Sequence, residues 1–172
     1  MGLRDAELVV VDRGRRLAFT FEDLMRYHGP GSPAGVAHAF KVLERGLPLL
    51  GAAGTVERRE IVIRTAFGGP GARVAFELVT RAVTDGRYAV DPALGRPERG
   101  IALERFVFRL AYRDRAATLV AREGSVPDEL IALARRDPRS AAEEARLDDV
   151  KRETAERVIA AAAADVYDAE SG

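Results

Sequence analysis

The sequence predicts an α+β fold, in which a mixed or antiparallel sheet with a C-terminal hairpin is packed by helices and followed by a long C-terminal helix. Apolar and polar residues alternate from Arg105 to Arg113, and a turn then returns the chain through Ala116 to Arg122, which is typical of a hairpin. Helix-start signals precede several segments of helical periodicity. Strand-like and helical segments do not alternate strictly, which disfavours a doubly wound parallel sheet.

The N-terminal third is expected to contain one strand and two helices. Leu8–Val11 is a short apolar run that ends in polar residues, as a strand would. Thr20 and Asp23 resemble a capping box for a short helix that ends at Gly29. Ser32–Pro33 supplies an N-cap residue and a first-turn proline for a second helix. The apolar face of this second helix consists of Val36, Ala39, Phe40, Leu43 and Leu47.

The rest of the chain is expected to place two strands and a helix before the hairpin, and two helices after it. Glu60–Phe67 alternates with the period of a strand, a helix follows from about residue 72 to 85, and Tyr88–Val90 is a second short strand. After the hairpin, Ser125–Asp128 caps a helix. Ser140–Glu143 forms a capping box for the last helix, which is predicted to reach about Val166.

Length and composition indicate one globular domain over residues 1–172, with a core at about 19–133 and the C-terminal helix at about 140–166. Lys+Arg and Asp+Glu balance at 27 each, so neither nucleic acid nor a membrane is expected as a partner. The absence of cysteine excludes disulfides and thiolate ligation by this chain, and no cofactor or metal is expected. No apolar run approaches the ~20 residues that span a bilayer, and the expected location is the cytoplasm.

Two loops have a composition that favours a binding site. Tyr27–Pro33 and Phe67–Arg73 are rich in Gly and Pro, and each leads into a predicted helix. Glycines let a ligand approach the main chain, and the free N–H groups of a helix N-terminus favour an anion. The second loop is not a P-loop, because no Lys-Ser/Thr pair follows it. The alternative interpretation is that both segments are ordinary turns.

The chain contains two histidines, for which the sequence predicts different surroundings. His28 lies in the first glycine loop, where its side chain can reach a cleft and act as a general acid or base. A structural role is the alternative, and the sequence offers no carboxylate partner from which to assemble a triad. His38 is expected to face water, because it lies opposite the apolar face of its helix, beside Lys41 and Arg45.

The segment around the first loop resembles the start of the FmdE-like family, which is named after a component of formylmethanofuran dehydrogenase. Members of that family begin with a short helix and a His-Gly-His-x-x-Cys-Pro-Gly loop that runs into a second helix. His28 and Gly29 match the first two residues of this loop, and Pro33 matches its proline. Pro30 stands in place of the second histidine and Ser32 in place of the cysteine.

The middle of the chain is similar to the same family. The family's strand, cysteine-bearing loop and helix ending in Gly-Cys-Thr-x-Gly-Lys correspond to Glu60–Phe67, Gly68–Gly71 and Ala82–Arg87. The hairpin and Val126–Leu130 also fit, so that the resemblance extends over about residues 19–133. It implies the family's fold, a pocket between two loops and a tendency to dimerise. It does not imply metal binding, because other residues occupy the cysteine positions.

The leading functional hypothesis is a metal-free, divergent member of this family that binds a small anionic ligand between the two glycine loops. The expected polar contacts are His28, Ser32 and Arg73, with Tyr27 and Arg87 at the edge of the pocket. The first alternative is an enzyme that uses His28 as a general acid or base in the same pocket. The second alternative is a structural or adaptor protein that acts through an exposed apolar stripe on its C-terminal helix.

A homodimer is also expected, partly from the resemblance and partly from the last predicted helix. An apolar face of nearly half the circumference is wider than a helix at the edge of a monomer needs. The small residues from Ala160 to Ala164 would allow a second helix to approach closely. The alternative is that the helix packs back on its own chain. The stripe consists of Leu147, Val150, Thr154, Ala155, Val158, Ile159, Ala161, Ala162 and Val166.

Overall fold

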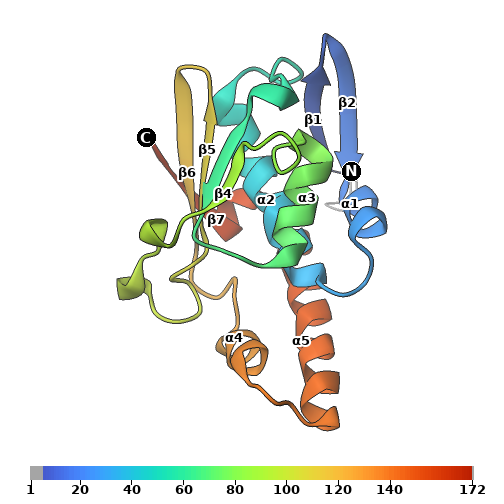
Figure 1. The fold of residues 1–172 in the computed structure, drawn as a ribbon, viewed down its shortest axis with the longest axis vertical. Coiled ribbons are helices and arrows are strands. Elements are labelled where there is room, and N and C mark those ends of the chain that lie inside the picture. The colour runs from blue at the N-terminus through green and yellow to red at the C-terminus, as the bar shows by residue number, and fades with distance from the viewer. Residues whose placement is uncertain (1–5, 172) are drawn as a thin grey trace.

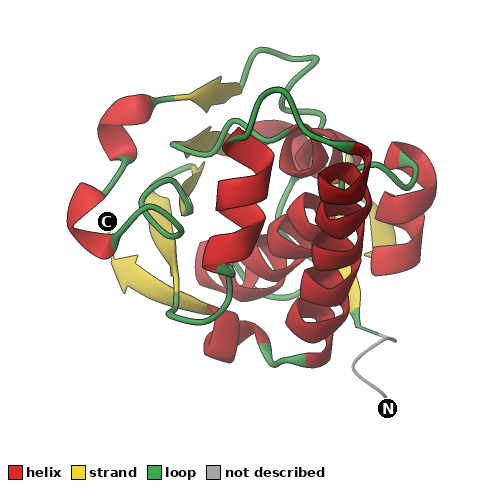
Figure 2. Ribbon diagram, turned by 90° about the horizontal axis from the view of Figure 1, so that it is seen from below, coloured by secondary structure: helices red, strands yellow, loops and turns green. Residues whose placement is uncertain are grey.

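The computed structural model describes residues 6–171 and confirms the α+β class (Figure 1). A five-stranded sheet lies on one side of a helical layer, and a two-stranded hairpin lies on the other. Helix α2 (Pro33–Leu50) runs through the middle of this arrangement, and helix α3 (Pro70–Thr80) packs beside it. Seen from below, the longer helices gather on one side of the five-stranded sheet (Figure 2).

The five-stranded sheet has the order β4-β3-β5-β6-β7. Only β3 and β4 pair in parallel, and the other neighbours are antiparallel. Strands β5 and β6 form the predicted hairpin, whereas β7 was not predicted, because the preceding helix was expected to continue to Val166. The five strands are β3 (Val62–Thr65), β4 (Tyr88–Val90), β5 (Val107–Tyr112), β6 (Arg115–Ala121) and β7 (Tyr167–Ser171).

The N-terminal hairpin consists of β1 (Glu7–Asp12) and β2 (Arg15–Thr20), which pair antiparallel along their whole length. The sequence predicted β1 but not β2. Helix α1 (Phe21–His28) follows directly and has the predicted capping box, in which the Thr20 side chain accepts from the Asp23 N–H and the Asp23 carboxylate accepts from the Thr20 N–H. This local hydrogen bonding ends the strand and starts the helix at the same residue.

Helix α2 is buried on all sides over most of its length. The sheet, α3, the β1–β2 hairpin and the C-terminal helix α5 (Ala141–Ala160) all pack against it. Val36, Phe40 and Leu43 are buried as predicted, but so are residues that were expected to face water, including Lys41. A helix surrounded by other elements has no solvent face, so the amphipathic interpretation of this segment was wrong.

No helix among residues 6–171 is long and apolar enough to cross a membrane.

Helix α3 begins near the predicted start but ends earlier than expected. It was predicted to reach about residue 85, whereas Arg81 adopts a left-handed conformation with φ 60° and ends it at Thr80. Short 3₁₀ helices lie in the connecting segments: η2 (Arg58–Glu60), η3 (Pro92–Leu94) and η4 (Pro97–Arg99).

The C-terminal region contains α4 (Asp128–Arg135), α5, the short helix α6 (Ala163–Val166) and then β7. Ser140 and Glu143 form the predicted capping box of α5. The helix ends at Ala160, and the chain then turns so that Tyr167 begins the strand beside β6. In Figure 1, α4 and α5 extend below the sheet and the N-terminal end of α2.

The wide apolar stripe of α5 is covered within the chain, because α5 packs against α2 and α4. The stripe residues Leu147, Val150, Thr154 and Val158 are each 3% exposed or less. The stripe therefore supplies no exposed seam, and the argument from it to a dimer interface or an adaptor surface was wrong. The dimer itself stays a prediction that rests on the resemblance alone.

Candidate ligand-binding site

The two glycine loops meet in the structure, because the N-terminal turns of α2 and α3 touch. Gly71 permits this contact: a Cβ on it would lie 2.6 Å from the Ser32 carbonyl oxygen and 3.1 Å from the Val36 nitrogen. Gly35 faces the same junction, with the Ala72 nitrogen 3.2 Å from the position of its missing Cβ. At Gly71 only hydrogen fits between the backbones, and at Gly35 a methyl group would make a tight contact, so the glycines let the two loops approach closely.

A cavity of about 300 Å³ opens beside this junction, and we call it the loop cavity. Its walls come from the start of α2, the backbone of Gly69–Gly71, the residue before β5, α4 and α5. Most of the wall is apolar, which is usual for sites that hold small organic ligands. The apolar side chains include those of Ala34, Phe67, Phe106, Leu130, Ile131 and Ala134. The polar side chains are those of Ser32, His38 and Lys151.

Lys151 supplies the positive charge of the loop cavity. Its ammonium group donates to the Gly31 carbonyl oxygen at 3.2 Å, which joins α5 to the first glycine loop. Among residues 6–171, no carboxylate forms an ion pair with it, and an ammonium group has two further N–H donors. Lys151 was not among the predicted site residues. Positions 31 and 151 are 120 residues apart, and no local pattern connects them.

His38 is buried under the loop cavity, so the prediction that it faces water was wrong. It is 1% exposed, because α2 is enclosed on all sides. Its Nε2 lies 3.2 Å from the Ser125 carbonyl oxygen, and its Nδ1 lies 2.7 Å from the Tyr167 hydroxyl. A carbonyl only accepts, so Nε2 carries the proton and the Tyr167 hydroxyl donates to Nδ1. Both ring nitrogens are therefore occupied within the protein.

Burial keeps His38 neutral. Loss of solvation lowers the pKa of the imidazole to about 4, the hydrogen bond to Ser125 raises it in part, and Arg157 lowers it further. Burial also raises the pKa of the Tyr167 hydroxyl well above its ordinary value. The floor of the loop cavity is therefore uncharged at neutral pH, and the centroid of the His38 ring lies 5.0 Å from that of Phe106.

Of the five predicted site residues, Ser32 is the one that lines the loop cavity. Its side chain makes no capping hydrogen bond to α2, contrary to the expectation from the sequence, and the hydroxyl is thus left for other partners. Tyr27 is 52% exposed, and neither it nor His28 lines the cavity. The Nδ1 of His28 bonds the Gly29 carbonyl oxygen at 3.0 Å. Within residues 6–171, no carboxylate or hydroxyl bonds this histidine, so the partner that the enzyme alternative requires is not found there.

The two predicted arginines lie away from the loop cavity. Arg73 is exposed on α3. Arg87 has an internal role: its guanidinium donates to the carbonyl oxygens of Arg58, Ile61 and Thr80 and pairs with Asp85 at 3.1 Å. It holds the end of the α3 region against the start of β3, because a guanidinium satisfies several carbonyls at once.

The residues at the positions that the predicted resemblance assigns to metal ligands do not fit a metal. His28 is the one ligand-type side chain that matches, and Ser32 and a loop of Gly and Pro replace the others. Residues 6–171 contain no group of three or more His, Cys, Asp or Glu side chains placed to hold a metal ion. One imidazole supplies too few donors for a closed four-coordinate site.

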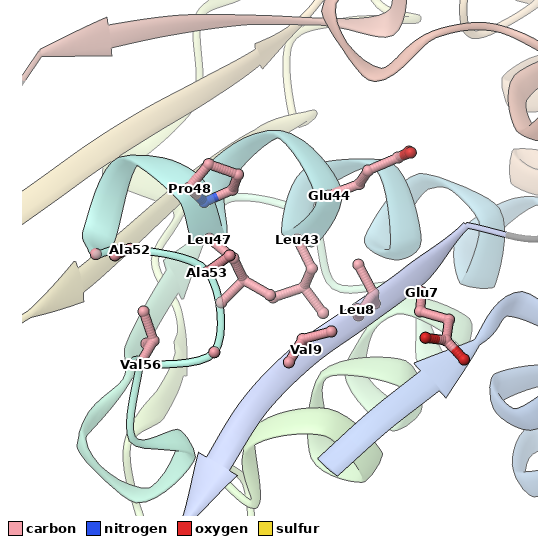
Figure 3. A pocket seen from close by; sticks show the side chains of 12 residues that line it. Glu7, Leu8, Val9, Leu43, Glu44, Leu47, Pro48, Ala52, Ala53 and Val56 are labelled. Atoms are coloured by element: carbon pink, nitrogen blue, oxygen red, sulfur yellow. The ribbon is translucent and has the colours of Figure 1, made fainter. Parts of the chain in front are cut away.

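A second hollow lies at the other end of α2 and has the opposite character (Figure 3). We call it the α2 groove; its volume is about 140 Å³. It lies between β1 and the last turns of α2, and its charged side chains are Glu7 and Glu44. Its other lining residues are Leu8, Val9, Leu43, Leu47, Pro48, Gly51–Gly54 and Val56.

Comparison with known proteins identifies neither a family nor a function for this chain. No protein-family model matches the chain, and no curated protein matches it either.

Proposed function

We propose that the protein binds a small organic anion in the loop cavity. The observation that carries this proposal is the ammonium group of Lys151, which has no carboxylate partner among residues 6–171 and lies beside an apolar hollow between the two glycine loops. A charge-assisted hydrogen bond from this ammonium to a ligand carboxylate is stronger than a neutral one, and the apolar walls beside it can hold the rest of an organic anion. The ligand then supplies the missing carboxylate.

The contact between the two glycine loops supports the place that the sequence predicted for the binding site. The polar residues of the proposed site differ from those that were predicted. Ser32 remains a contact, and Lys151 takes the part that the sequence assigned to Arg73 and His28. Membership of the FmdE-like family stays a prediction, as does the homodimer. The proposed function depends on neither.

The melting temperature of the protein in different salts tests the proposal. Sodium benzoate, succinate and phosphate are compared with sodium chloride at equal ionic strength. A ligand at 100 times its Kd stabilises the folded state by about 2.7 kcal/mol, which raises the melting temperature of a domain of this size by roughly 5–10 °C. At least one organic anion is expected to give such a shift.

Two variants locate the binding site. Lys151→Met should remove the shift, and Arg73→Met, which removes an exposed cation of α3, should keep it. A shift that Arg73→Met removes and Lys151→Met keeps would place the anion outside the loop cavity. The absence of any shift beyond that of chloride would contradict the proposed function.

A further inference from the structure

The polar groups of the loop cavity limit the charge of its ligand. Both nitrogens of His38 are bonded within the protein, so this ring offers the ligand an uncharged aromatic edge and no donor. The remaining polar side chains are Lys151 and Ser32. One ammonium and one hydroxyl match a single carboxylate. A second negative charge held inside the loop cavity would lie against its apolar walls without a partner there, at a large cost in solvation.

The aromatic walls indicate the shape of the ligand. The rings of Phe67 and Phe106 stack with their centroids 4.4 Å apart and an interplanar angle of 29°. The same cavity is lined by the aliphatic side chains of Leu130 and Ile131 on α4. A cavity lined by aromatic rings and by branched aliphatic side chains suits a flat ring, since aromatic rings favour stacked or edge-to-face contacts.

The volume of the loop cavity limits the size of its ligand. An engineered apolar cavity of about 150 Å³ takes one benzene molecule, so about 300 Å³ holds roughly twice as many atoms. About a dozen non-hydrogen atoms fit by this comparison, which is a phenyl ring with a short carboxylate-bearing chain. A neighbouring hollow shares Phe67, Phe106 and Ile131 with the loop cavity and is also lined by the exposed Arg105.

We propose that the ligand of the loop cavity is an apolar monocarboxylate of arylalkanoate type. Its ring lies between the Phe67–Phe106 wall and Ile131, and its carboxylate accepts hydrogen bonds from Lys151 and Ser32. This assignment rests on the proposed function and narrows it to one class of anion. Dicarboxylates and phosphate, which suit a site built from arginines, are excluded by it.

Isothermal titration calorimetry with 3-phenylpropanoate tests the assignment. The neutral control is 3-phenylpropanamide, which has the same shape, and the dianionic control is succinate. From typical affinities per atom, 3-phenylpropanoate is expected to bind with Kd on the order of 0.1–1 mM. The amide and succinate should bind at least about tenfold more weakly, because each lacks either the charge or the ring.

Three variants make the result specific to the loop cavity. Lys151→Met should weaken 3-phenylpropanoate at least about tenfold and bring it to the level of the amide. Ala134→Phe, which fills the cavity from α4, should abolish binding of both aromatic compounds, and Arg73→Met should change nothing. Circular dichroism at the titration temperature checks that each variant is folded.

The outcomes separate this assignment from the proposed function. Tighter binding of succinate than of 3-phenylpropanoate, with loss in Lys151→Met, would overturn the monocarboxylate assignment and leave the proposed function standing. Equal binding of 3-phenylpropanoate and its amide would also overturn it, because the carboxylate would then not be recognised. Binding of 3-phenylpropanoate that Ala134→Phe leaves unchanged would overturn the assignment of the ligand to this cavity. Failure of every anion to bind would overturn both proposals.

Discussion

The two ends of helix α2 carry two hollows of opposite character. At the N-terminal end, the loop cavity is about 300 Å³ in volume and the charged side chain in its wall is Lys151. At the C-terminal end, the α2 groove is about 140 Å³ and its charged side chains are Glu7 and Glu44. Both are walled mainly by apolar residues, so charge and size distinguish them. An organic anion is attracted to the first and repelled by the second.

The chain has two lysines, one near each of these hollows, and the difference between them shows which charge is available to a ligand. Lys41 is completely buried and pairs with Glu44 at 2.8 Å, so its charge is neutralised within the protein. Lys151 has a carbonyl partner and no carboxylate partner among residues 6–171. The presence of a cation is thus not enough to mark a binding site. The useful observation is a cation without an internal counter-charge beside an open hollow.

The largest effect is expected where the two glycine loops touch. Gly71→Ala should lower the free energy of unfolding by about 2–3 kcal/mol, because the new methyl group meets the backbone of Ser32 and Val36, which yields less easily than a flexible side chain. Gly46, near the other end of α2, gives the matched comparison. Its new methyl group would meet the flexible side chain of Leu110, and the gain in helix propensity of about 1 kcal/mol offsets part of the cost.

Urea unfolding at a pH of about 7.5 measures both variants. Gly46→Ala is expected to stay within about 1 kcal/mol of the unchanged protein. Gly31→Ala serves as a control in the first loop itself, since no atom lies within 4 Å of the position of its missing Cβ. If Gly71→Ala were no more costly than Gly31→Ala, the close contact between the two loops would not hold.

The sequence predicted well what local chemistry determines. The capping boxes at Thr20 and Ser140 start helices with hydrogen bonds among four neighbouring residues, so a local pattern is sufficient. Strands β2 and β7 were missed, because their pairing depends on partners that the local sequence does not identify. The burial of α2 was missed for the same reason: an alanine-rich helix with a few polar residues shows an apparent solvent face until its neighbours are known.

The candidate site, like the fold, was predicted from the sequence only where local chemistry determines it. The glycine loops were predicted, because glycine at a helix start has a direct structural meaning. Lys151 was missed, since α5 brings it to the first loop from 120 positions away. One signal was available: in a chain that otherwise uses arginine, its two lysines occupy one fully buried position and one cavity wall. Arginine and lysine are not interchangeable where space is confined, so rare lysines merit inspection.

The next largest effect concerns His38 and the pH dependence of stability. The folded-state pKa of about 4 lies below the ordinary 6.5, so between these values the unfolded chain binds a proton that the folded chain does not. The stability that neutral His38 contributes is therefore present above about pH 6.5 and is lost as the pH falls towards about 4. Between about pH 7.5 and about pH 5, the free energy of unfolding should decrease by about 2 kcal/mol.

Urea unfolding at the two pH values checks this effect, and the variants identify its source. His38→Gln cannot titrate but can still donate and accept, so most of the decrease of about 2 kcal/mol should disappear. His28→Gln, in the first glycine loop, should retain it. A decrease of the same size in His38→Gln and in the unchanged protein would show that another group is responsible.

The smallest effect concerns the ion pair at the α2 groove and tests whether Lys41 is satisfied within the protein. Glu44→Gln removes the charge and keeps a hydrogen-bond acceptor, so it leaves a fully buried ammonium with a weaker partner. We expect a loss of about 1 kcal/mol in the free energy of unfolding, because the ammonium keeps a hydrogen-bond acceptor but loses the opposite charge of the carboxylate. Lys41→Met should cost less, since it removes the buried charge and leaves Glu44, whose side chain is 25% exposed, in contact with water.

The Glu44→Gln variant also sharpens the comparison of the two ends of α2. It should create no new affinity for 3-phenylpropanoate in calorimetry, because Lys41 remains buried and the α2 groove, at about 140 Å³, is smaller than the loop cavity. Lys151→Met, measured in the same titration, removes the cation of the loop cavity. It should abolish the binding of 3-phenylpropanoate, which Glu44→Gln should leave unchanged. An increase in affinity on Glu44→Gln would mean that any lysine without a counter-charge near an apolar hollow is sufficient to bind 3-phenylpropanoate. The loop cavity would then not be a specific site.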